Sequence, residues 1–206
     1  MKKNVLVTAG STWIKIDEVR VLTNRFTGRT GLELARELQN AGCNVTVLVN
    51  PHCVSKELSG LKVVKFYYYD ELKDGVARLL KKQKFDAIIH TAAVSDYYLP
   101  DPACAKIPSG KKALVLKLTP TQKIIKLMRA QASRTLLVQF KLENSTKGLV
   151  EKAYKSLKSN DSDFVVANAL DSIGRKYLIG RDARIVEFKG VKSLAVGLAK
   201  IINNNE

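Results

Sequence analysis

The sequence has few cysteine, histidine and aromatic residues, and these scarcities narrow the class of protein. Three cysteines stand far apart, at positions 43, 53 and 104, and only two histidines occur among 206 residues. No CxxC pair is present, which argues against a disulfide framework and against a structural zinc site. Cys53 follows His52 directly, but a place in the core or on the surface explains this pair better than metal binding.

Long hydrophobic runs are also lacking. No apolar stretch approaches the length of a membrane span, and the apolar run after Asn4 is too short for the core of a signal peptide. We therefore expect a soluble, cytoplasmic protein that binds no membrane. The length permits one good hydrophobic core and is short for two ordinary domains with a linker, so we expect a single domain over residues 1–206.

Positive charge is abundant, with a formal net charge of +16. Such a surplus predicts an anionic partner, which means a nucleotide, a phosphorylated metabolite or a nucleic acid. Only 7% of the residues are aromatic, and the run of tyrosines at 67–69 is followed by Asp70 and Glu71, a poor platform for stacking bases. We therefore favour a solvated basic surface over one that binds nucleic acid.

Strand and helix patterns alternate along the chain. A helix between two neighbouring strands is typical of right-handed crossovers in a parallel sheet. We therefore expect an α/β fold with a doubly wound, mostly parallel Rossmann-like sheet, helices on both faces, and a ligand at the carboxyl ends of the strands. The expected strands are 5–7, 45–49, 63–66, 87–90, 113–118, 135–140, 164–167 and a hairpin over 177–188, and the expected helices are 32–41, 71–82, 121–131, 147–157 and 191–203.

The stretch from Asn24 to Gly31 is the most informative one. It contains Thr27, two arginines and two glycines three residues apart, and it opens a helix. Backbone N–H groups at a helix start attract anions, and arginine suits forked contacts to phosphate oxygens. The stretch predicts a phosphate-binding site, while plain close packing of the two glycines stays open as the alternative.

Two further loops follow expected strands and belong to the same edge of the sheet. Residues 8–12 are small and rich in hydroxyl groups, and residues 91–97 are small except for Asp96 and Tyr97. Asp96 is suited to accept ligand hydroxyls or to help hold a metal, and equally to form a turn. Lys106 closes the long loop that follows, and loops of this length in compact domains are often functional.

Several segments in this order resemble the phosphopantothenoylcysteine synthetase family. They include the Asn24–Gly31 stretch, the Ala-Ala-Val-Ser-Asp-Tyr run at 92–97, and the Lys-Ile pair at 106–107. The remaining matching segments are 7–12, 16–20, 140–143 and 166–168. The resemblance covers about residues 4–170, and no decarboxylase half is present, so we expect a monofunctional enzyme.

The resemblance implies a reaction in two steps. The carboxylate of 4′-phosphopantothenate attacks the α-phosphate of CTP or ATP, releasing pyrophosphate, and the amine of L-cysteine then displaces the nucleotide. Such chemistry needs Mg²⁺ and oriented donors. Asn24 and Lys106 are the implied catalytic residues. Arg20, Asn24 and Ala93 are implied to bind substrate; Gly10, Ser11, Thr27, Gly28, Ala92, Asp96, Lys106, Phe140, Lys155 and Asn160 are implied to bind nucleotide.

Relatives of this family pair two subunits, so a homodimer is also implied, with the segment 113–118 as an edge that needs covering. Three departures from the family pattern stand out. Ser11 replaces a glycine of the family pattern, and one serine donor is lost beside Thr27. The position of the second lysine on a later helix is occupied by Ser159 or Asn160, and Lys158 is a candidate to replace that lysine. Sequence leaves CTP and ATP open, and we favour CTP.

Two rival functions remain. A dehydrogenase that binds NAD(P) is suggested by the glycines at 28 and 31 and by Tyr154 with Lys158, but these glycines come too late after the first strand. Asn50 also stands where an acidic residue would bind ribose hydroxyls. The second rival is a basic protein that binds nucleic acid.

Overall fold

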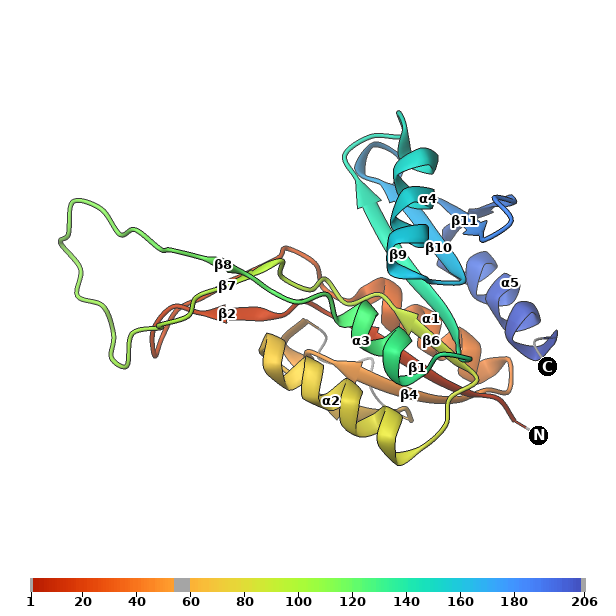
Figure 1. Ribbon diagram of the computed structural model, residues 1–206, viewed down its shortest axis with the longest axis horizontal. Helices are drawn as coiled ribbons and strands as arrows, with labels where there is room; N and C mark the ends of the chain where they lie inside the picture. Colours follow the sequence, from red (N-terminus) through yellow and green to blue (C-terminus); the bar gives the residue numbers. More distant parts are fainter. Residues whose placement is uncertain (1, 54–59, 205–206) are drawn as a thin grey trace.

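An eight-stranded sheet forms the centre of the computed structural model, which describes residues 2–53 and 60–204 (Figure 1). Six neighbouring strands are parallel, and the two at one edge are antiparallel. The strand order across the sheet is β12-β11-β10-β9-β6-β1-β4-β5. The bounds are β1 Asn4–Ala9, β4 Asn44–Val49, β5 Lys62–Lys65, β6 Ala87–His90, β9 Leu136–Glu143, β10 Phe164–Ala169, β11 Arg175–Gly180 and β12 Ile185–Lys189.

Helices cover both faces of this sheet, which confirms the predicted doubly wound fold. Side chains of a strand alternate between faces, and in β1 Val5 and Val7 pack in one core cluster while Leu6 packs in another. The first face is covered by α1 (Arg29–Asn40) and α5 (Gly190–Asn204). The second is covered by α2 (Tyr69–Lys82), α3 (Ile124–Gln131) and α4 (Leu149–Asn160).

An arm of short strands extends from the carboxyl side of the sheet and was not predicted (Figure 1). It contains two antiparallel pairs, β2 (Trp13–Lys15) with β3 (Val21–Thr23), and β7 (Tyr97–Tyr98) with β8 (Thr119–Pro120). The long loop of residues 99–118 joins β7 to β8. Strands of two or three residues are too short to show a periodic pattern, which explains why the sequence did not reveal them.

The strand predicted over residues 113–118 is wrong. The segment has no regular secondary structure within the described chain, and Leu114 and Val115 are exposed. Alternating apolar residues favour a strand only where a neighbouring strand completes the hydrogen bonds. The helix predicted from residue 121 begins at Ile124 instead, because Thr121 is engaged with the loop after β6, where its hydroxyl donates to the Ser95 carbonyl oxygen at 2.7 Å. Within the described residues no helix has the length and apolarity that a membrane crossing demands.

Candidate active site

The candidate site lies where the loops after β1 and β6 meet the start of α1. Gly28 precedes α1 with a φ of 71°, and a Cβ atom placed on it would lie 2.5 Å from the Gly10 nitrogen. A Cβ atom on Gly31 would lie 2.3 Å from the Thr91 hydroxyl oxygen and 2.8 Å from the Ala9 Cβ. Both glycines are therefore required for close packing of α1 on the two loops, which is the alternative that the sequence left open.

Three of the predicted site residues are held together by hydrogen bonds. The Asn24 side-chain amide donates to the Ala93 carbonyl oxygen at 3.3 Å, and the Ala93 N–H donates to the Gly10 carbonyl oxygen at 2.9 Å. The Ser11 hydroxyl donates to the Phe26 carbonyl oxygen at 2.8 Å, which fixes the loop before α1. Ser11 itself is buried, whereas Asn24 and Thr27 are exposed at the opening of the site.

Arg20 and the loop that carries Lys106 meet in the arm. The guanidinium of Arg20 donates to the Asp17 carboxylate at 2.7 Å and to the Ile107 carbonyl oxygen at 3.2 Å. Lys106 is exposed on the loop, next to Ile107. The structure thus brings two predicted residues, from opposite ends of a long stretch of chain, to one place.

Asp96 has a cationic partner that the sequence analysis did not single out. Its carboxylate accepts a hydrogen bond and an ion pair from Lys123, the residue just before α3, and its carbonyl oxygen accepts the Thr121 N–H at 2.9 Å. Both side chains of the ion pair are exposed. The start of α3 therefore lies beside the loop of Ala92 and Asp96, so it belongs to the candidate site.

A polar pair lies at the carboxyl ends of β1 and β6. The Thr8 hydroxyl lies 2.8 Å from His90 Nδ1 and accepts the Ala92 N–H at 3.2 Å. Burial lowers the pKa of His90 from 6.5 to about 4. His90 is therefore neutral at physiological pH, and its Nδ1 shares a hydrogen bond with the Thr8 hydroxyl. This arrangement fixes the backbone just before Ala92.

Asn160, predicted to bind nucleotide, is turned toward the sheet. Its amide donates to the Gln139 side-chain oxygen at 2.8 Å and contacts the Ser156 hydroxyl at 3.3 Å. The ammonium of Lys158, the candidate stand-in for the missing lysine, lies 5.1 Å from the centre of the Tyr154 ring, and the Tyr154 hydroxyl donates to Arg181 in the β11–β12 turn. A helix advances 100° per residue, so residues 156 and 158 point to different sides of α4. Lys155 remains exposed on α4.

The end of β9 carries the last group of predicted residues. Phe140 is half-buried against the core below α1 and α5. Three residues on, Glu143 pairs with Lys152 at 3.0 Å and with Lys141 at 3.1 Å. These hydrogen bonds, the one from Lys152 first, hold the pKa of Glu143 below its usual value. A carboxylate paired in this way is poorly available to a metal.

A protein-built magnesium site does not fit the residues that the structure describes. Within residues 2–53 and 60–204, no group of three or more His, Cys, Asp or Glu side chains is arranged to hold a metal ion. The carboxylates of Asp96 and Glu143 pair with lysines. Magnesium in nucleotide enzymes is commonly held by phosphates and water with few protein ligands, and such an ion arrives with the nucleotide.

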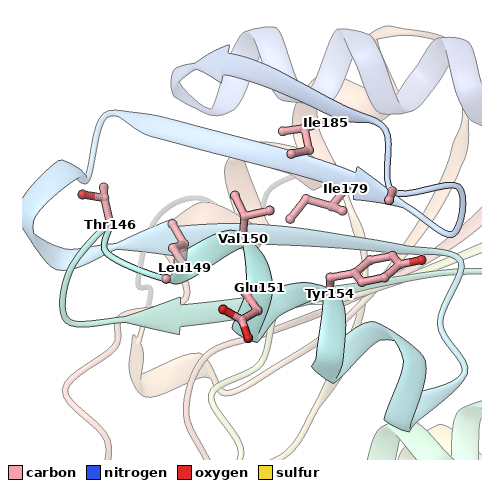
Figure 2. Close-up of a pocket in the computed structure, with 9 residues that line it drawn as sticks. Thr146, Leu149, Val150, Glu151, Tyr154, Ile179 and Ile185 are labelled. Carbon is pink, nitrogen blue, oxygen red and sulfur yellow. The ribbon is translucent and has the colours of Figure 1, made fainter.

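A separate hollow of about 510 Å³ lies between α4 and the β11–β12 hairpin (Figure 2). Apolar side chains from both sides face it, among them Leu149, Val150, Ile179 and Ile185. None of the predicted site residues lines it. The hollow is therefore distinct from the candidate active site.

Comparisons with known proteins show the family of the chain. Residues 1–190 match the model of the DNA/pantothenate metabolism flavoprotein C-terminal domain. The coenzyme A biosynthesis bifunctional protein CoaBC of Thermococcus kodakarensis is 36% identical over 186 residues, which are 87% of this chain and 45% of that protein. The chain therefore spans about half the length of the curated relatives that it matches.

Two solved structures share the fold. The DNA/pantothenate metabolism flavoprotein from Streptococcus pneumoniae superposes with a TM-score of 0.86 at 26% identity, and the match covers 99% of this chain and 100% of that one. A Cab2 mutant in complex with phosphopantothenate-cysteine superposes with a TM-score of 0.82 at 18% identity, over 98% of this chain and 87% of that one. At that identity the second match supports the fold alone.

Proposed function

The chain belongs to the DNA/pantothenate metabolism flavoprotein C-terminal domain family, and we propose that it is a phosphopantothenate–cysteine ligase of coenzyme A biosynthesis. One observation carries the proposal. At the carboxyl edge of the sheet Asn24 donates to the Ala93 carbonyl oxygen, and in the arm that extends from this edge Arg20 donates to the carbonyl oxygen of Ile107, the neighbour of Lys106. Ligands of doubly wound folds bind at this edge.

The first step forms an acyl-nucleotide. A carboxylate oxygen of 4′-phosphopantothenate attacks the α-phosphorus of a nucleoside triphosphate, and the bond to the leaving pyrophosphate breaks. Lys106 supplies positive charge to the triphosphate, and backbone N–H groups at Thr27 and Gly28 are suited to a phosphate at the start of α1. Ala92, Asp96, Phe140 and Lys155 complete the proposed nucleotide site, with the Asp96 partner Lys123 added by the geometry.

The second step forms the amide. The amine of L-cysteine attacks the acyl carbon, the bond to the nucleotide breaks, and the nitrogen loses a proton. Negative charge develops on the acyl oxygen, and a neutral donor such as the Asn24 amide stabilises it without adding net charge. The Asn24–Ala93 hydrogen bond orients this amide.

We propose CTP as the co-substrate, with ATP as the alternative, and Mg²⁺ as an ion that enters bound to the triphosphate. Support for CTP is the similarity to prokaryotic relatives over most of the chain. Because the nearby carboxylates pair with lysines, the phosphates are the better ligands for the ion, and this supports its entry with the triphosphate.

The rival dehydrogenase function loses support from two observations. Asn50, at the end of β4, is buried; its amide donates to the Ser11 carbonyl oxygen at 2.7 Å, and its side-chain oxygen accepts the His52 N–H at 3.1 Å. It is therefore not free to bind a ribose. The Tyr154 hydroxyl donates to the Arg181 carbonyl oxygen at 3.1 Å, away from the candidate site.

A thermal-shift experiment separates the three functions. The melting temperature of the purified protein is measured with CTP and Mg²⁺, with ATP and Mg²⁺, with NADPH, and with a single-stranded oligonucleotide. We expect stabilisation by CTP or ATP, because a ligand that binds only the folded state raises its stability. Stabilisation by NADPH or by the oligonucleotide alone would contradict the ligase.

We also propose a cytoplasmic homodimer. Support for the dimer is the arm, where Val21, Leu22, Tyr97 and Tyr98 are exposed, together with Val115 in the loop, which is 79% exposed. Clustered exposed apolar groups mark surfaces that bind protein. Support for the cytoplasm is the presence of free thiols at Cys43 and Cys104, as expected in a reducing compartment.

A further inference from the structure

Asp17 is the most enclosed acidic residue near the site. Its residue is 2% exposed and its side chain is fully buried. One carboxylate oxygen, Oδ1, accepts the N–H groups of Val19 at 2.9 Å and Arg20 at 2.8 Å. The other, Oδ2, accepts the Arg20 guanidinium at 2.7 Å and the Ile107 N–H at 3.0 Å. The carboxylate is therefore fully engaged.

The two oxygens do different work. Oδ1 closes the local turn between β2 and β3, whereas Oδ2 joins that turn to a residue 90 positions later in the chain. Arg20 closes the contact from the other side, through the Ile107 carbonyl oxygen. The pKa of Asp17 lies below its ordinary value, chiefly because the Ile107 N–H donates to the charged form.

This contact determines where Lys106 lies. Lys106 directly precedes Ile107, on the loop 99–118 that has no regular structure within the described residues. A second bond, from the Ala103 N–H to the Ile16 carbonyl oxygen at 2.9 Å, holds the same loop one residue from Asp17. Fixing an exposed lysine on a long loop costs conformational entropy when a ligand binds. These two hydrogen bonds order the loop before binding and so reduce that cost.

We propose that Asp17 is a positioning residue for the ligase reaction. Its hydrogen bonds form a clasp that holds the Lys106 loop against the Arg20 turn, so that Lys106 and Arg20 both contact the bound substrates. The inference rests on the proposed function. Arg20 would contact the phosphopantothenoyl group and Lys106 the triphosphate, and Asp17 touches neither. Its effect is to hold two binding groups at a fixed separation, which is the kind of order that lowers a bimolecular barrier.

Asp17→Asn breaks this clasp selectively. The amide oxygen still accepts the N–H groups of Val19 and Arg20, while the new NH₂ group faces two donors, the Ile107 N–H and the Arg20 guanidinium. Two donors cannot share a hydrogen bond, so the contact with Ile107 and the ion pair with the Arg20 guanidinium are lost, while the backbone hydrogen bonds of the turn stay. The matched control is Glu18→Gln, an identical chemical change at the adjacent residue, which pairs with Lys15 on the surface.

A second variant attacks the same bond from the loop. Ile107→Pro removes the N–H donor and leaves the Asp17 turn intact. If Asp17→Asn lowers the folded fraction, Ile107→Pro still reports on the clasp, because the buried carboxylate and its turn are unchanged. Circular dichroism melting establishes that each variant is folded at the assay temperature.

Amide hydrogen exchange and steady-state kinetics test the inference together. We expect exchange over residues 99–118 to quicken in Asp17→Asn and Ile107→Pro, with a rise in KM for the triphosphate and a fall in kcat, together about 10- to 100-fold in kcat/KM. Glu18→Gln should match the wild type. Kinetic constants equal to those of the wild type in either variant, or a lower melting temperature with an unchanged KM, would overturn the positioning role. An inactive wild type overturns the ligase and this role together, whereas an active wild type with unaffected variants overturns this role alone.

Discussion

Gly28 lies so close to Gly10 that a Cβ atom on Gly28 would come within 2.5 Å of the Gly10 nitrogen and 2.8 Å of its Cα atom. Gly28 also has a φ of 71°, in the left-handed region where side chains cost energy. Two separate constraints therefore require glycine here. The contact sets the distance between the start of α1 and the loop after β1, which is the proposed phosphate site.

We predict that Gly28→Ala destabilises the protein by several kcal/mol, roughly the sum of a left-handed alanine at about 1 kcal/mol and a backbone clash. Urea unfolding measures the loss. The matched control is Gly148→Ala, since Gly148 precedes α4 with a φ of 67° and its Cβ would meet nothing within 4 Å. Equal losses in the two variants would show that the contact with Gly10 adds nothing.

Asn24→Asp should slow the second step of the reaction more than the first. The change keeps the size of the side chain but places a carboxylate beside a developing oxyanion, and losing one such donor costs about 10²–10³ in rate. Rapid-quench kinetics with and without cysteine separate the steps. A loss confined to stability is not expected, because Gly28 precedes α1 and no side chain caps that helix.

Lys106→Ala should slow the first step of the reaction, in contrast to Asn24→Asp, which should slow the second. It removes positive charge from the triphosphate before any bond forms, so the first step should slow, with pyrophosphate release as the readout. Normal turnover of the Asn24→Asp protein, or equal slowing of both steps by both variants, would refute the separate roles.

Stability should fall as the pH drops from about 6.5 toward 4. The folded protein holds His90 neutral, with a pKa of about 4 against 6.5 in the unfolded chain. In this window the unfolded state binds a proton that the folded state does not, so acid favours unfolding by up to about 3 kcal/mol. His90→Asn removes the titration while its oxygen replaces Nδ1 as the acceptor for Thr8. Urea unfolding at several pH values should show a flatter profile for His90→Asn than for the wild type and for the His52→Asn control. Parallel profiles would contradict this prediction.

The arm predicts a dimer in solution. Light scattering should report twice the chain mass of 22.8 kDa at micromolar concentration. Leu22→Glu, at a residue 43% exposed on β3, should shift the protein to the monomer, because a charge is costly to bury in an apolar contact. Val196→Glu, at a residue 54% exposed on α5 and outside the arm, should leave the mass unchanged. A wild-type monomer would overturn the dimer.

Long periodic segments could be predicted from the sequence, and short ones could not. The buried strands and the helices α1, α2, α4 and α5 carry clear apolar patterns, and their positions agree with the structure to within a few residues at each end. The arm depends on strands of two or three residues, which are too short to show a periodic pattern. Segment 113–118 was wrongly predicted as a strand, because an alternating pattern does not reveal whether a partner strand exists.

Several partners of the predicted site residues could not be read from the sequence. The motifs singled out Asn24, Ala93, Arg20 and Lys106, whose roles stay predictions; the structure shows the Asn24–Ala93 contact and the contact of Arg20 with Ile107, next to Lys106. Lys123 stood in a basic stretch with nothing to distinguish it from its neighbours. Gln139, Asn160 and Ser156 form one polar cluster because β9 and α4 pack together, and this contact is invisible in a linear pattern.

Pyrophosphate release tests the ligase most directly. Purified protein with Mg²⁺, 4′-phosphopantothenate and L-cysteine is given CTP, ATP, GTP or UTP in turn, and pyrophosphate and 4′-phosphopantothenoylcysteine are measured together. We predict one pyrophosphate per product molecule, with CTP the preferred nucleotide, and pyrophosphate without product when only cysteine is left out, limited to about one turnover. No pyrophosphate from any of the four nucleotides, in an assay where an authentic ligase is active, would contradict the account.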